Sequence, residues 1–114
     1  MSGSYEREKL GAAVYALAAS AAPIQKRLEY AWMAMHTLKA HGLIDSERAV
    51  EYDEIYKSLT ADKSDEQGGY VPTTCAKLSD DEAAQIATAI VDLNARLNSD
   101  RIYRLEDQLR DLKS

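Results

Sequence analysis

The sequence contains 114 residues, of which 46% are hydrophobic, and its formal net charge is −5 at pH 7. This length predicts a single domain, 1–114, with a core large enough to be stable without disulfides or structural metals. The acidic balance, without any concentration of positive charge, argues against nucleic-acid binding and against contact with anionic membranes.

The first third of the chain, about Ser4 to His41, has the longest apolar pattern. Its positions alternate in steps of four and three, and a mean spacing of 3.5 residues is typical of a packed α-helix. The pattern consists of Leu10, Val14, Leu17, Ala21, Ile24, Leu28, Ala31, Met35 and Leu38.

Pro23 lies in the middle of this pattern. Proline removes one helical hydrogen bond and disfavours the helical conformation of the residue before it. Because the pattern keeps its phase across the proline, we favour one long N-terminal helix that is kinked near Ala19–Pro23. The alternative is two collinear helices, with Ser20 capping the second and Pro23 in its first turn.

A short middle helix is predicted from Ser46 to Leu59. Gly42 ends the preceding helix, Asp45 caps the new one, and Ile44 can pack back onto Ala49. The short connection predicts that the first and middle helices form an antiparallel pair. The apolar side of the middle helix consists of Tyr52, Ile55, Tyr56 and Leu59.

Residues 60–78 form the predicted long loop, since they have no helical period and contain a Gly68-Gly69 pair and Pro72. A loop of this length within a compact domain is typically functional or disordered. Its second half, from Tyr70 to Cys75, is rich in β-prone residues, and we expect it to lie extended on the bundle.

A capping box at Ser79-Asp80-Asp81-Glu82 predicts the start of a long C-terminal helix. Two apolar patterns follow, and the second is offset by one residue from a continuation of the first. The helix is therefore either continuous with a local change of winding or interrupted near Ser99 or Asp100, and we favour a break or bend. The first pattern consists of Ala83, Ile86, Ile90, Leu93 and Leu97, and the second of Ile102, Leu105, Leu109 and Leu112.

These elements predict an all-α fold, an antiparallel helical bundle with a long N-terminal helix that Pro23 can kink, a short middle helix and a long or bent C-terminal helix. Two long helices and one short helix make a thin body, so we expect it to be thickened by self-association into a homo-oligomer. The pattern from Ile102 to Leu112 either takes part in that contact or folds back on the first helix.

The sequence offers no constellation that predicts catalysis, a metal or a cofactor. His36 and His41 are five residues apart, about 140° round a helix, and do not share a face. Cys75 is the only cysteine, so it lacks the paired thiols of a zinc site and excludes an internal disulfide. A lone cysteine fits a reducing compartment, and the N-terminus has no signal pattern, so we expect a cytoplasmic protein that is not an enzyme.

Aromatic and methionine side chains mark the candidate contact surface. Trp32 lies beside the apolar pattern, whereas Tyr30 and Met33 point to other sides of the same helix. A helix that is apolar on several sides is covered on several sides, either by the rest of its own chain or by a partner. The candidate interaction residues are Tyr30, Trp32, Met33, Tyr70, Pro72 and Tyr103.

The resulting functional hypothesis is a non-catalytic protein–protein interaction module, such as an adaptor, an inhibitor or an assembly subunit. The alternative is a small-ligand-binding helical bundle with a site near Trp32 and the Tyr70 loop. An exposed apolar patch favours the first hypothesis, and an enclosed concave surface beneath residues 60–78 favours the second.

Overall fold

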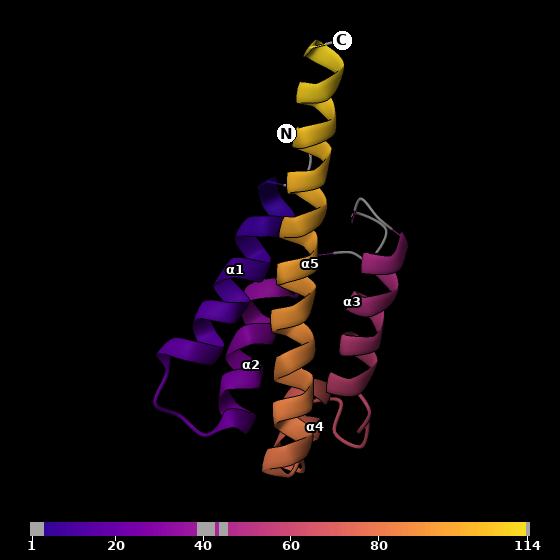
Figure 1. Cartoon of the computed structure of the whole chain (residues 1–114). Coiled ribbons are helices and arrows are strands. Elements are labelled where there is room, and N and C mark those ends of the chain that lie inside the picture. The colour runs from indigo at the N-terminus through magenta and orange to yellow at the C-terminus, as the bar shows by residue number, and fades with distance from the viewer. Residues whose placement is uncertain (1–3, 39–42, 44–45, 114) are drawn as a thin grey trace.

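The computed structural model describes residues 4–38, 43 and 46–113. The predicted all-α bundle is confirmed for this part of the chain. The longest helix runs the length of an elongated molecule of 57 × 27 × 21 Å, with the first two helices on one side of it and the third on the other (Figure 1). The helices are α1 (Ser4–Ala19), α2 (Ile24–Met35), α3 (Ser46–Leu59), α4 (Tyr70–Ala76) and α5 (Asp80–Lys113).

The first third of the chain is a helical hairpin. α1 ends at Ala19, and α2 returns beside it in the opposite direction (Figure 1). The hydroxyl of Tyr5, near the start of α1, donates a hydrogen bond to Thr37 Oγ1, just beyond the end of α2, at 2.6 Å. The favoured kinked long helix is therefore wrong, and so is the alternative of two collinear helices.

Polar contacts hold the turn of this hairpin. Arg27 Nη1 donates to the carbonyl of Leu17 at 2.8 Å, and Arg27 Nε donates to the carbonyl of Ala22 at 2.9 Å. Pro23 precedes α2 as its N-cap with ψ of 155°, outside the helical region. The apolar pattern stays in phase because each helix turns its own apolar side to the common core and the turn happens to preserve the spacing.

The core lies between α5 and the helices packed around it. Leu28, Met35 and Leu59 are among its fully buried side chains. In the predicted N-terminal pattern, Val14 and Ile24 are half-buried, and Ala21, in the turn, is exposed. The remaining positions of that pattern are all buried: Leu10, Leu17, Leu28, Ala31, Met35 and Leu38.

α3 begins and ends where the sequence predicts. Its buried Tyr52 donates its hydroxyl proton between the carbonyls of Met35 and Leu38, with distances of 3.2 and 2.9 Å, and so closes the end of α2. Three predicted end signals, Gly42, Ile44 and Asp45, lie outside the described residues.

The predicted loop of residues 60–78 contains a helix, and the extended conformation expected for Tyr70 to Cys75 is wrong. Gly69, with φ of +92°, precedes α4 as its N-cap. Pro72 lies in the first turn, where a missing N–H removes no intrahelical bond. One face of α4 buries Val71 and Cys75 beside Thr74, and this burial outweighs their β propensity.

α5 is continuous, so the favoured break or bend near residues 98–100 is wrong. Its predicted capping box is confirmed, because Glu82 N donates to Ser79 Oγ at 3.1 Å and Ser79 N donates to Glu82 Oε1 at 2.9 Å. Asp100 does not cap a new helix. Its Oδ2 instead accepts a hydrogen bond from Arg48 Nε of α3 at 3.0 Å.

Candidate functional site

The C-terminal third of α5 extends beyond the body of the molecule. In Figure 1 it projects past the other helices as the yellow end of the ribbon. Leu97 is the last buried residue of α5, and from Ile102 onward its residues are exposed, apart from the half-buried Arg104. This segment therefore receives little support from the rest of the chain.

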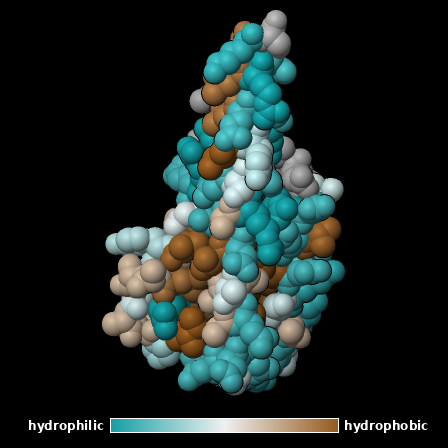
Figure 2. Space-filling view, in the orientation of Figure 1, coloured by the Kyte–Doolittle hydropathy of each residue, from teal (hydrophilic) through white to brown (hydrophobic). Residues whose placement is uncertain are grey.

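Four aliphatic side chains lie on one face of this extension, and we call them the α5 stripe. Their steps of three, four and three residues place them on one side of a helix. In the space-filling view they form a hydrophobic band along the projecting end (Figure 2). The fraction of each residue exposed to solvent is 56% for Ile102, 48% for Leu105, 56% for Leu109 and 83% for Leu112.

The α5 stripe continues down the body of the molecule on the same helix face. Ala87, Val91, Asn94 and Asn98 precede it, and the steps from Ala87 to Leu112 average about 3.6 residues, the period of a straight α-helix. The one-residue offset between the two sequence patterns now has an explanation. The first pattern faces the core, and the second belongs to a neighbouring face of the same helix.

This face borders a groove between α1 and α5. The part beside the first half of α5, of about 340 Å³, is apolar and lies between Val14 and Ala18 of α1 and Ala87 and Val91 of α5. The part nearer the extension has a volume of about 450 Å³ and is bordered on α1 by Arg7 and Gly11. On α5 it is bordered by Asn94, Asn98, Arg101, Ile102 and Leu105. We call these two parts together the α1/α5 groove. It leads directly into the α5 stripe, and Figure 2 shows a second hydrophobic area on the same side of the molecule.

The α1/α5 groove has open space on its α1 side and a polar atom without a hydrogen-bond partner on its α5 side. A Cβ atom added at Gly11 would meet no heavy atom within 4 Å, so α1 offers open space there. Asn94 Oδ1 is buried and is the one such side-chain atom in the described residues that has no hydrogen-bond partner. A buried polar atom without a partner is costly, so Asn94 is stabilised when its side chain turns toward a hydrogen-bond donor.

On the opposite side of α5, an ionic network fixes α3 where the extension begins. Arg48 is buried and contacts Glu47, Glu51 and Asp100, and Arg96 Nη1 also lies 3.0 Å from Glu51 Oε2. Burial opposes the charge of Arg48, but Glu51 and Asp100 outweigh it and raise the pKa of the guanidinium group. This side of α5 is therefore occupied within the chain.

The predicted interaction residues are spread over three helices. Tyr30 and Met33 of α2 are exposed, whereas Trp32 is half-buried. The Trp32 ring lies 5.4 Å from the Tyr56 ring and 6.2 Å from the Tyr52 ring, measured between centroids. Trp32 thus joins α2 to α3.

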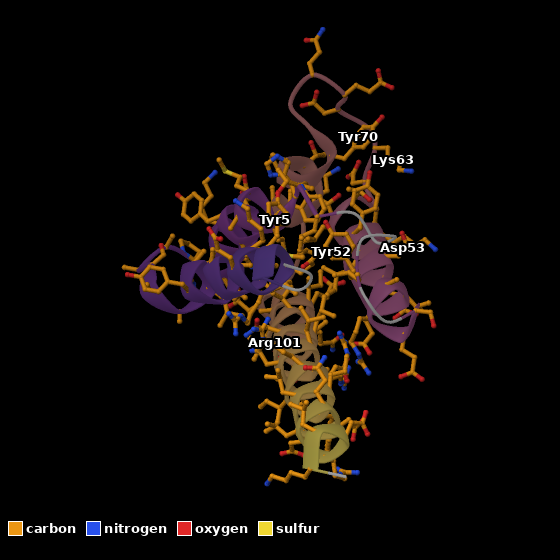
Figure 3. The ribbon with its side chains drawn as sticks, turned by 90° about the horizontal axis from the view of Figure 1, so that it is seen from above. Tyr5, Tyr52, Asp53, Lys63, Tyr70 and Arg101 are labelled. Carbon is orange, nitrogen blue, oxygen red and sulfur yellow. The ribbon has the colours of Figure 1, made fainter. Side chains whose placement is uncertain are left out.

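Tyr70 and Pro72 lie on α4, and Tyr103 is exposed on the α5 extension. The hydroxyl of Tyr70 donates to Glu66 Oε1 at 3.3 Å, and Figure 3 shows Tyr70 beside the segment before α4, away from Tyr52. The structure therefore does not bring all six predicted residues into one surface. The small-ligand hypothesis stays a prediction.

Sequence reasoning named Tyr103, which lies on the α5 extension but away from the α5 stripe, and left the stripe itself undecided. The stripe was visible as an apolar pattern, but the sequence does not show how far α1 reaches along α5. The useful signal was the offset between the two patterns, because it separates a core-facing side from a second apolar side on one unbroken helix.

The titratable side chains most relevant to chemistry are occupied or unreactive. Cys75 is buried, and burial raises the pKa of its thiol to about 11, so it is protonated at neutral pH. His36 Nδ1 lies 2.8 Å from the carbonyl of Met33, to which it can donate. His41 lies outside the described residues. Across residues 4–38, 43 and 46–113, no group of three or more His, Cys, Asp or Glu side chains is placed to hold a metal ion.

None of the described helices combines the length and the apolar character needed to cross a membrane. Comparisons with protein-family models, with curated proteins and with solved structures find no match to this chain.

Proposed function

We propose that the chain is a non-catalytic protein–protein interaction module whose contact surface is the α5 stripe together with the α1/α5 groove. The observation that carries this proposal is the exposure of Ile102, Leu105, Leu109 and Leu112 on one face of a helix that extends beyond the body.

Two physical arguments support a partner at this surface. Burying a leucine or isoleucine side chain is worth about 1.5–3 kcal/mol, so a surface that covers the α5 stripe gains a large driving force. In addition, most helical stability in proteins comes from tertiary packing, and the α5 extension receives little of it from the described residues, so its end can fray when nothing covers it. A partner that covers the stripe therefore also stabilises the helix that presents it.

The sharpest test is photo-crosslinking from defined positions of α5. A photoreactive amino acid at Leu109 reports contacts of the stripe, and the same amino acid at Asp107 is the control. Asp107 lies two residues earlier, about 160° round the helix. In cells that express the chain, we expect a discrete protein adduct from position 109 and none from position 107. Equal labelling from both positions, or no adduct from position 109, would overturn the proposal.

A further inference from the structure

We propose that the partner is a second copy of this chain, and that the two copies associate with their α5 helices parallel, each α5 stripe and α1/α5 groove facing those of the other copy. This inference rests on the proposed function and names the partner of the same surface.

The α5 stripe has the spacing of a self-complementary helical seam. In heptad notation Ile102 and Leu109 occupy a positions, and Leu105 and Leu112 occupy d positions. Two such helices bury these side chains against each other, and a β-branched residue at a with leucine at d favours two-stranded association. Ile102 and Leu105 provide that combination where the extension leaves the body.

The stripe alone is too small for a stable interface. Each of its four side chains removes on the order of 100 Å² from water when it is buried. The sum is on the order of 400 Å² per copy, about half of the 800 Å² per partner that is common in stable complexes. The contact must therefore include more than the stripe, and within the described residues the same helix face continues from Ile102 into the α1/α5 groove.

The groove can accept this continuation. A two-fold axis parallel to α5 places α1 of one copy against the side of α5 of the other copy that borders the stripe. That side carries small exposed residues, including Ala95 and Ser99, and α1 offers Gly11 and Ala18. Small side chains on both surfaces allow the helices to approach closely, which extends the buried area into the body.

Charges beside the stripe distinguish the parallel from the antiparallel orientation. Arg101 and Glu106 flank the seam at g and e positions, and in a parallel pair Arg101 of each copy faces Glu106 of the other copy. An antiparallel pair that covers the whole face from Ala87 to Leu112 is centred near residue 100. Such a pair brings the two Arg101 side chains together near the two-fold axis. Arg7, which lines the same part of the groove, adds to that positive charge. The charges therefore favour the parallel pair.

Asn94 precedes the seam on the side that borders the groove, at a g position in the same notation. Its Oδ1 atom is buried against its own chain and has no hydrogen-bond partner among the described residues. In an antiparallel pair that covers the whole face, Asn94 lies opposite Leu105 of the other copy, so these two positions report the competing orientation.

Cysteine crosslinking tests the orientation directly. At d positions of a parallel pair, identical residues face each other, so Leu105→Cys and, in a separate variant, Leu112→Cys should each form a disulfide-linked dimer under mild oxidation. Tyr103→Cys is the control, because Tyr103 is more exposed than Leu105 yet lies about 160° round the helix. The native Cys75 is buried and does not compete.

Light scattering of the unmodified chain at several concentrations completes the test, with a dimer mass expected. A mixed disulfide between Asn94→Cys and Leu105→Cys chains, with no Leu105→Cys homodimer, would overturn the parallel geometry. A monomer mass at every concentration, with no crosslinking, would overturn the second copy as partner. In that case an adduct from position 109 to a different protein would still uphold the proposed function.

Discussion

Arg48 Nε of α3 donates a hydrogen bond to Asp100 Oδ2 of α5 at 3.0 Å, between residues 52 positions apart in the chain. Asp100 lies just before the α5 stripe, so this contact fixes α3 close to the point where α5 leaves the body. The pair thus connects the stability of the fold to the orientation of the proposed contact helix.

Replacing Asp100 with alanine should lower the free energy of unfolding by about 1–3 kcal/mol, because the buried Arg48 loses a charged hydrogen-bond partner. Urea unfolding measures this change. Asp107→Ala is the matched control, since Asp107 makes an exposed ion pair with Arg110 and gains the same helix propensity. The control should change the free energy by no more than about 0.5 kcal/mol. Similar losses in the two variants would contradict the structural role of Asp100.

The hairpin of α1 and α2 predicts a short distance between Tyr5 and Thr37, whose side chains are hydrogen-bonded. Because the tyrosine side chain itself spans most of the gap between the two backbones, the double variant Tyr5→Cys/Thr37→Cys should be joined within one chain by a short bifunctional thiol reagent and not by a direct disulfide. The product is seen as a faster-migrating monomer on a denaturing gel. One continuous helix would separate these positions by about 48 Å at 1.5 Å per residue. A folded double variant in which the reagent modifies both thiols without joining them would count against the hairpin.

The buried Tyr52 predicts a loss of stability at high pH. Burial, together with the nearby Tyr56, raises the pKa of Tyr52 from 10.0 to about 12. Because the folded state holds this proton more tightly, the contribution is complete below pH 10 and is lost as the pH rises through about 12.

The unmodified chain should lose stability between pH 10 and pH 12, and a Tyr52→Phe variant should lose less stability over the same range. Thermal unfolding across that range measures the difference, and other alkaline titrations cancel in it. The control is Tyr15→Phe, because Tyr15 is 74% exposed. If Tyr52→Phe keeps the full alkaline loss, Tyr52 does not cause it.

Charge reversal beside the α5 stripe tests the parallel dimer independently of crosslinking. In the Arg101→Glu variant the new glutamate lies opposite Glu106 of the second copy. Because the two negative charges repel each other, we expect the dimer dissociation constant to rise about tenfold. Adding Glu106→Arg should restore most of the affinity, because the pair is then reversed. Sedimentation equilibrium measures both constants. Lys57→Glu on α3, an exposed change of the same charge, should leave the constant unchanged. A double variant no tighter than the single one would contradict the pairing.

The sequence by itself determined the features that depend on neighbouring residues. The capping box of Ser79 and Glu82, the limits of α3 and the apolar sides of the helices follow from contacts within one or two turns. Such contacts have nearly the same geometry in any surrounding fold, so spacing alone identifies them.

Tertiary structure alone decided where α1 and α2 meet, whether residues 70–76 are helical and which apolar face of α5 remains exposed. The N-terminal pattern is equally compatible with one helix and with a hairpin, because a repeat of 3.5 residues specifies a face and not its partner. For the same reason, the pattern from Ile102 to Leu112 could not show that it stays uncovered. That outcome depends on the length of α1 beside α5, which is fixed by the turn before Pro23 and by the packing of the whole bundle.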